Sequence, residues 1–181
     1  MQRAETERRR KQVCKSLLIL AAILAGICVL RFCIRVTTVR GISMEATLSN
    51  GDCLVIDRLS YCLKDPERFD IVVFSYQYRP NTYYIKRVIA LPGERVRIGA
   101  NGVIYVNGSA LIEHYSEEKI SKSGLAQNEI VLGADEYFVL GDNRNDSLDS
   151  REPNIGNIKR SDIVGRAWLR LLPCRRFGVL K

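Results

Sequence analysis

A lysine within a predicted β-strand and a serine in a turn-rich segment are the residues of this chain best suited to act together as base and nucleophile. Lys86 lies in "YYIKRVIALPGE" (residues 83–94), where alternating side chains predict a half-buried strand. Burial among apolar side chains lowers the pKa of a lysine, and a neutral lysine can act as a general base. Ser43, in "GISMEATLSNGD" (residues 41–52), is the nucleophile that such a base would activate.

Each of these residues also has a purely structural interpretation. A strand lysine commonly packs its aliphatic stem on apolar surface with its ammonium in water, and a loop serine is commonly solvated. The serine is not in a nucleophile elbow, because Glu45 stands where the G-x-S-x-G pattern requires glycine. A Ser-His-Asp triad would need His114, the single histidine, which lies in a polar segment that we predict to be exposed.

A third polar cluster is "GDNRNDSLDSREPN" (residues 141–154), which interleaves acidic and basic side chains. Such a loop is usually solvated, but alternating aspartates and arginines can also brace an active site through ion pairs. Because the chain has one histidine and its cysteines lack metal-ligand spacing, we expect no metal and no other cofactor.

The six cysteines do not indicate a disulfide framework. A bridge between Cys53 and Cys62 is one alternative, but we favour small, buried, hydrophobic cysteines. Three cysteines lie in or beside an N-terminal apolar run and three lie farther along the chain: Cys14, Cys28, Cys33, Cys53, Cys62 and Cys174.

The elements that must position the candidate residues are mostly strands. Beyond Val36, short runs rich in β-branched and aromatic residues alternate with turn signals such as Pro92-Gly93 and Asn101-Gly102. The sequence therefore predicts a mostly β fold in a single domain. We predict strands within residues 53–60, 69–76, 83–91, 94–99, 103–108, 136–140 and 162–172, and an exposed loop over residues 113–130.

An apolar run precedes this domain. It consists of "LLILAAILAGICVL" (residues 17–30) and continues to Ile34, so a helix over residues 17–34 would be about 27 Å long, close to the thickness of a bilayer's hydrocarbon core. A cleavable signal peptide has a similar pattern, but no small-residue cleavage site follows the run. We therefore predict an uncleaved transmembrane anchor over residues 16–35.

The charge distribution predicts the orientation of this anchor. Residues 1–15 carry six basic and two acidic residues, which is half of the net charge of +8. Such a tail predicts a cytoplasmic N-terminus and a single-pass membrane protein whose domain, residues 36–181, is extracytoplasmic. A nucleic-acid-binding protein would be expected to carry its positive charge on the folded domain, so we expect no nucleic-acid partner.

Several segments together resemble the sequence boxes of the type I signal peptidases, the membrane-bound Ser/Lys endopeptidases that remove signal peptides from exported proteins. With the anchor, the resemblance covers roughly residues 17–172, and a single anchor with a compact domain resembles the short Gram-positive-type enzymes. It implies a bacterial cell-membrane enzyme that cuts signal-bearing preproteins after an A-x-A pattern. The matching segments are "SMEATL", "DIVVF", "YYIKRVIALPGE", "GDNRNDSLDSR" and "IVGRA".

By position, the resemblance implies that Ser43 is the nucleophile and Lys86 is the general base. Ser147 matches the serine whose hydroxyl orients the lysine amine. Four charged residues match the ion-paired braces of the family's site: Asp142, Arg144, Asp149 and Arg151.

Two positions depart from the family pattern. Ala46 stands where the family box S-M-x-P-T-L has proline, so we expect a looser turn after the nucleophile. Gly41 stands where some members have a Ser or Thr that completes the oxyanion hole, which leaves the Ser43 backbone N–H as the donor that we can identify. Ile42 and Met44 are candidates for lining the substrate groove or contacting lipid, and burial in the core is an equal alternative.

Two other functions are compatible with the same resemblance. One is a specialised processing peptidase of the same fold, serving conjugation, pilus assembly or the secretion of a few proteins. The other is an inactive, membrane-tethered binding protein, although such a relative would be expected to lack the serine or the lysine. Self-cleaving repressors share the Ser/Lys dyad, but they carry a DNA-binding domain and no anchor.

Overall fold

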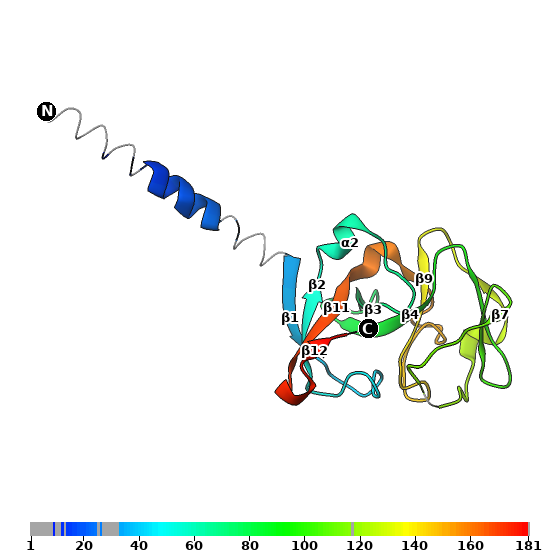
Figure 1. The fold of residues 1–181 in the computed structure, drawn as a ribbon. Coiled ribbons are helices and arrows are strands. Elements are labelled where there is room, and N and C mark those ends of the chain that lie inside the picture. The colour runs from blue at the N-terminus through cyan, green and yellow to red at the C-terminus, as the bar shows by residue number, and fades with distance from the viewer. Residues whose placement is uncertain are drawn as a thin grey trace, which may run out of the picture.

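The computed structural model describes residues 9, 12, 14–24, 26, 33–116 and 118–180. Residues 14–24 are helical, and from β1 onward the chain forms two antiparallel sheets joined by turns and short helices (Figure 1). The mostly β fold class is thereby confirmed. In the described part of the chain, no helix combines the length and the apolar character that crossing a bilayer requires. Residues 25 and 27–32 of the expected anchor lie outside the described residues.

The larger sheet contains eight strands in the order β1-β2-β11-β3-β4-β9-β10, with β12 paired to β11. A short helix, α2 (Ser60–Leu63), follows β2. The strands are β1 (Ile34–Thr38), β2 (Cys53–Asp57), β3 (Ile71–Ser75), β4 (Tyr83–Ala90), β9 (Glu136–Leu140), β10 (Ile158–Lys159), β11 (Ile163–Leu172) and β12 (Gly178–Val179).

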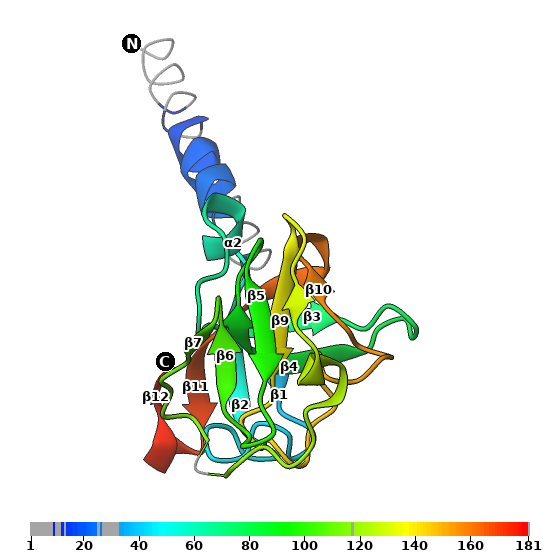
Figure 2. The ribbon, with the colours of Figure 1, turned by 90° about the vertical axis from the view of Figure 1, so that its right-hand side faces the viewer.

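The smaller sheet has the strand order β7-β6-β5-β8, and Figure 2 views the molecule from the side on which it lies. Its central hairpin turns at the predicted Asn101-Gly102 pair, where Gly102 has a φ of 77° that a glycine adopts without strain. The strands are β5 (Arg95–Ile98), β6 (Ile104–Val106), β7 (Ser109–Ala110) and β8 (Ile130–Val131).

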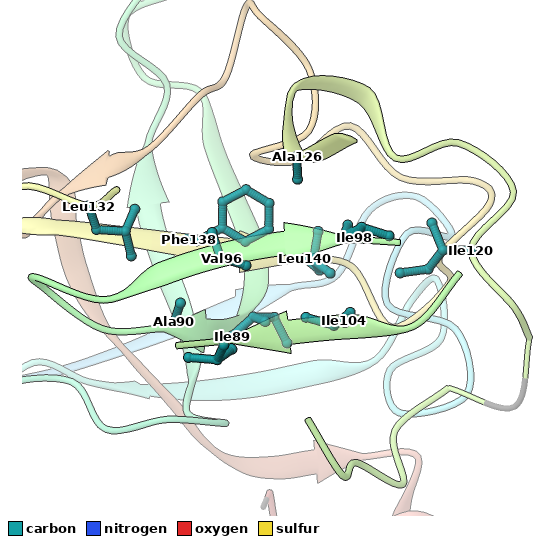
Figure 3. Close-up of a cluster of buried hydrophobic side chains, with 11 residues drawn as sticks. Ile89, Ala90, Val96, Ile98, Ile104, Ile120, Ala126, Leu132, Phe138 and Leu140 are labelled. Atoms are coloured by element: carbon teal, nitrogen blue, oxygen red, sulfur yellow. The ribbon is translucent and has the colours of Figure 1, made fainter. Parts of the chain in front are cut away.

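Buried apolar side chains hold the two sheets together. One cluster joins β5 and β6 to the ends of β4 and β9 (Figure 3). The central strand β3 is buried on both faces, because Ile71 and Val73 pack in a second cluster whereas Val72 and Phe74 pack in a third. Double-sided burial explains why β3 appears in the sequence as a continuous apolar run rather than an alternating one.

Strand β1 begins at Ile34, two residues before the predicted start of the domain at Val36. Ile34 pairs with Asp57, and Arg35 pairs with Ile56, both on β2. The β-branched residues of "IRVTT" suit an extended strand, and the pairing with β2 satisfies their backbone groups. The folded domain therefore includes the last two residues assigned to the anchor.

The alternative bridge between Cys53 and Cys62 is not formed. Cys53 begins β2, and Cys62 lies in α2 beyond the other end of that strand, so a five-residue strand about 13 Å long separates them. Cys28 lies outside the described residues. The other cysteines are free: Cys14, Cys33, Cys53, Cys62 and Cys174.

Candidate active site

Lys86 and Ser43 meet at the edge of strand β4. The Nζ atom of Lys86 lies 2.6 Å from the Oγ atom of Ser43, a hydrogen-bond distance, and it also donates to the carbonyl oxygen of Ile85 at 3.1 Å. Lys86 is 2% exposed, so its amine does not extend into solvent as the structural interpretation of a strand lysine requires. The structure thus joins the two residues that the sequence selected.

The environment of Lys86 favours the neutral amine. Burial lowers the pKa of Lys86 from 10.5 to about 8, because desolvation penalises the charged form. The nearby carboxylates of Asp149 and Asp142 oppose this shift, and the guanidinium of Arg151 adds to it. A lysine with this pKa is partly unprotonated near neutral pH and can accept a proton from a hydroxyl group.

The dyad lies in a groove between two strand edges. Strand β9 pairs with β4 only from Arg87 onward. Among the described strands, none pairs with residues 83–86 on that side, and β1 is likewise paired on one side only. Although β2, β11 and β3 separate β1 from β4 in the sheet, the guanidinium of Arg35 lies 5.4 Å from the ring centre of Tyr83. The sheet therefore curls, and a cavity of about 430 Å³ lined by Ser43 and Lys86 lies between these strands.

The nucleophile loop (residues 41–52) is held from both sides. The backbone N–H of Asn143 donates to the carbonyl of Ser43, and its side-chain amide donates to the carbonyl of Ile42, each at 3.2 Å. Met44 is 2% exposed and packs in the core cluster beneath the loop, whereas Ile42 is 44% exposed. Of the two groove candidates, Met44 is thus a core residue that borders the groove, and Ile42 is a surface residue.

Both departures from the family pattern have unusual backbone geometry. Ala46 has a φ of 85°, a left-handed conformation that proline cannot adopt, since its ring holds φ near −65°. The loop therefore follows a path that excludes proline, rather than a loosened version of a proline-containing turn. Gly41 has a φ of 98° and donates its N–H to the side chain of Asn50, so a Ser or Thr at this position would be strained.

A buried ion pair links the strand of Lys86 to the brace loop (residues 141–154). Arg87 donates to both carboxylate oxygens of Asp142, at 2.8 and 2.7 Å, and both side chains are fully buried. The hydroxyl of Thr47 donates to the same carboxylate at 2.5 Å, and the ring of Tyr115 covers the guanidinium at 3.5 Å. The sequence assigned a bracing role to Asp142, but neither Thr47 nor Tyr115 was identified.

The other predicted braces are also ion-paired. Asp149 accepts two hydrogen bonds from the guanidinium of Arg151, each of 2.8 Å, and two from backbone N–H groups, of Gly141 at 3.1 Å and of Arg151 at 3.3 Å. Arg144 pairs with Glu113 and also donates to the carbonyl of Gly141. Glu113 was not identified from the sequence because it lies 31 positions away, in a segment that was expected to be an exposed loop.

Ser147 lies close to the dyad, but its expected contact with the lysine is not formed. A side chain at Gly141 would collide with both the Ser147 hydroxyl and the Ser43 carbonyl. Glycine at this position therefore allows both groups to lie against the backbone of residue 141. Among the described residues, the buried Ser147 hydroxyl has no hydrogen-bond partner. His114 is exposed, and no hydrogen bond joins it to the dyad. Within the described ranges, no cluster of three His, Cys, Asp or Glu side chains is placed to hold a metal ion.

The family model and the similar proteins all point to one family. The family model for signal peptidase, peptidase S26, matches residues 10–172. A probable signal peptidase I-2 from Synechocystis is 41% identical over 143 residues, which cover 76% of this chain and 63% of that protein. Signal peptidase I from Bacillus caldolyticus is 38% identical over 151 residues, covering 77% and 80% of the two chains. The chain thus spans less than two thirds of the Synechocystis relative.

A solved structure is also similar. The crystal structure of a signal peptidase I from Enterococcus faecalis V583 has 32% sequence identity and a TM-score of 0.48, and the match covers 57% of this chain and 97% of that one.

Proposed function

The chain belongs to the peptidase S26 family of signal peptidases, and we propose that it is a membrane-bound serine endopeptidase that removes N-terminal signal peptides from exported preproteins. The observation that carries this proposal is the 2.6 Å contact between the Lys86 amine and the Ser43 hydroxyl. The lowered pKa of Lys86 supports it, because the amine must be neutral to accept the serine proton.

The reaction uses the two residues in sequence. Neutral Lys86 accepts the hydroxyl proton as Ser43 Oγ forms a bond to the scissile carbonyl carbon, and the resulting ammonium donates its proton to the departing amine as the C–N bond breaks. The signal segment is then held as an ester on Ser43. Lys86 next takes a proton from water, and the hydroxide attacks the ester carbonyl carbon. As the bond from this carbon to Ser43 Oγ breaks, the Lys86 ammonium returns the proton to Oγ, so the signal peptide leaves with a free carboxyl group and the dyad is restored.

The oxyanion formed at the attacked carbonyl needs a hydrogen-bond donor. Among the described residues, no acceptor is recorded for the backbone N–H of Ser43, so this group is available as that donor. No side chain at position 41 can assist, because Gly41 has none. Removal of one oxyanion donor lowers the rate of other hydrolases by about 10²–10³-fold, so we expect slower turnover than in relatives with a Ser or Thr at this position.

The groove between β1 and β4 suits an extended peptide. Strand edges without partners offer backbone N–H and C=O groups to an incoming strand, and the groove is lined by apolar side chains such as Val39, Val73 and Ile85. We propose that the residues just before the cleavage site lie here with small side chains, following the A-x-A pattern of the family's substrates.

The proposed topology places this groove beside the bilayer. Residues 1–15 form a cytoplasmic tail, and the anchor begins at residue 16. Because β1 begins at Ile34, the anchor ends at residue 33 rather than at the predicted residue 35, and the extracytoplasmic domain follows it. Because ten positions separate Cys33 from Ser43, the nucleophile lies at most about 36 Å along the chain from the anchor. A cleavage site beside a membrane-embedded signal peptide is within reach of such a nucleophile.

Cleavage of a precursor by the full-length protein in detergent tests the proposal. We expect a generic signal-bearing precursor to be cut once after the A-x-A pattern, as identified by N-terminal sequencing of the product. Ser43→Ala and Lys86→Met should each abolish the cut, because they remove the nucleophile and the base. Lys64→Met, at an exposed lysine, is the matched control and should cut normally.

The outcomes separate the candidate functions. Cleavage of one partner protein but not of a generic precursor would indicate the specialised peptidase, and no cleavage of any precursor would indicate the binding protein. The intact, correctly spaced dyad favours an active enzyme over the binding protein. Normal cleavage by the Lys86→Met variant would refute the Ser/Lys mechanism.

A further inference from the structure

The carbonyl oxygen of Thr47 accepts hydrogen bonds from two arginines at the C-terminal end of the chain. Arg170 donates to it at 2.9 Å from near the end of β11, and Arg176 donates at 3.3 Å from the following turn. Figure 1 shows this C-terminal turn (red) beside the loop that follows β1 (cyan). The nucleophile loop is therefore held at a second point, the backbone carbonyl of the threonine whose hydroxyl donates to Asp142.

The same two arginines share a buried carboxylate. Asp52, with a side chain 3% exposed, lies 3.2 Å from Arg170 and 3.7 Å from Arg176. Arg176 also donates to the hydroxyl of Ser49 at 2.8 Å. One carboxylate near the end of the nucleophile loop thus faces both guanidinium groups, and these contacts fix the positions of the two arginines.

Apolar packing reinforces this contact. Leu180, near the C-terminus, is 5% exposed and belongs to the core cluster that contains Met44 and Leu48 of the nucleophile loop. Its backbone N–H donates to the carbonyl of Trp168 at 2.8 Å, which keeps the last residues against β11. The C-terminal segment thus supports the loop with both polar and apolar contacts.

Thr47 is part of the hydrogen-bonded turn that directly follows Ser43. Its N–H donates to the carbonyl of Met44 at 3.1 Å, and the N–H of Leu48 donates to the same oxygen at 2.7 Å, which closes a tight turn directly after Ser43. Ala46 lies inside this turn in the left-handed conformation. Such strained residues persist only where the surroundings over-determine the backbone, so the turn requires external contacts to keep its shape.

We propose that Arg170 and Arg176 are positioning residues that act through the Thr47 carbonyl to hold the turn after Ser43, and so keep the serine hydroxyl within reach of Lys86. The proposal rests on the proposed peptidase function. It assigns a role in the reaction to the C-terminal segment, whose last residues lie beyond the region that resembles the family. Neither arginine is among the residues that line the groove, and neither is hydrogen-bonded to Ser43 or Lys86, so their effect on the reaction is indirect.

The experiment compares arginine variants of the full-length protein in detergent. Arg176→Met is the first choice because this side chain is 34% exposed and tolerates replacement better than the more deeply buried Arg170. Arg176→Lys retains the charge with a single amine, and Arg175→Met, at an exposed neighbour in the same turn, is the matched control. The double variant Arg170→Met/Arg176→Met removes both contacts.

Two readouts are measured on each variant. Precursor cleavage gives kcat and KM separately, and hydrogen–deuterium exchange reports opening of the turn at residues 43–48. We expect kcat to fall about threefold in Arg176→Met and about tenfold in the double variant, with KM unchanged. Exchange at residues 43–48 should rise in both variants, Arg176→Lys should recover part of the loss, and Arg175→Met should match the wild type.

The outcomes distinguish this inference from the proposed function. If the wild type cuts no precursor, the peptidase proposal fails, and the exchange measurement still decides whether the arginines hold the turn. If the double variant does not fold, kcat and exchange of Arg176→Met alone are compared with those of the wild type. Unchanged kcat in a folded Arg176→Met protein, or unchanged exchange at residues 43–48, would overturn the positioning role.

Discussion

Arg87 donates two hydrogen bonds, of 2.8 and 2.7 Å, to Asp142, and neither side chain is exposed to solvent. This pair joins the strand that carries the proposed general base to the loop that holds the nucleophile backbone through Asn143. The geometry of the dyad therefore depends on an interaction that does not include either dyad residue.

Asp142→Asn should destabilise the domain by about 3–5 kcal/mol, because an amide removes the negative charge of Asp142 from a fully buried ion pair and turns one of the two acceptors that face Arg87 into a donor. Urea denaturation of the full-length protein measures this loss as a lower transition midpoint. Asp146→Asn, at an exposed aspartate in the same loop, is the control and should change stability by less than about 0.5 kcal/mol. Equal midpoints for the two variants would contradict the bracing role of the ion pair.

Ala46→Pro should lower activity, although proline is the residue of the family box at this position. Proline cannot adopt the φ of 85° that Ala46 has, so the turn after Ser43 would have to change shape. Ala46→Gly keeps that conformation and should stabilise the protein by about 1 kcal/mol, since glycine adopts positive φ without the steric cost that alanine has. Cleavage rates and thermal unfolding of both variants check this, and wild-type activity in Ala46→Pro would contradict the observed path of the loop.

Ser147→Ala separates a catalytic contribution from a structural one. The buried hydroxyl has no hydrogen-bond partner among the described residues, so its removal should leave stability unchanged or slightly raised. If the hydroxyl orients the Lys86 amine during the reaction, kcat should fall about tenfold or more. A variant with unchanged kcat would remove Ser147 from the proposed site, whereas a large loss of stability would show that it has a structural contact.

The elements that were predicted best are those with strong local signals. Strand β4 was located because alternating residues lead into the Pro92-Gly93 turn, and β9 matches its predicted range, residues 136–140. The two-residue strands β7, β8, β10 and β12 were not predicted, because two residues do not form a periodic pattern. Strand β1 was partly assigned to the anchor because Ile34 continues the apolar run that precedes it.

The candidate site was predicted where residue type and family resemblance agreed. Ser43 and Lys86 lie 43 positions apart, and the structure brings them together as expected. The partners that hold the loops were not found, because a hydrogen bond such as that from Arg170 to Thr47, across 123 positions, leaves no periodic or local trace in the sequence. Contacts of this kind depend on the order of strands in the sheet, which a single sequence does not specify.

The pH dependence of cleavage tests the central claim, that a neutral Lys86 accepts the proton of Ser43, most directly. Because burial lowers the pKa of Lys86 to about 8, the amine is neutral above this pH and protonated below it. We predict that kcat/KM for a signal-bearing precursor rises with pH to a midpoint near 8 and falls about tenfold per unit well below it, since protonated lysine cannot accept the serine proton. Full activity at pH 6, or a rise centred near the ordinary lysine pKa of about 10.4, would contradict it.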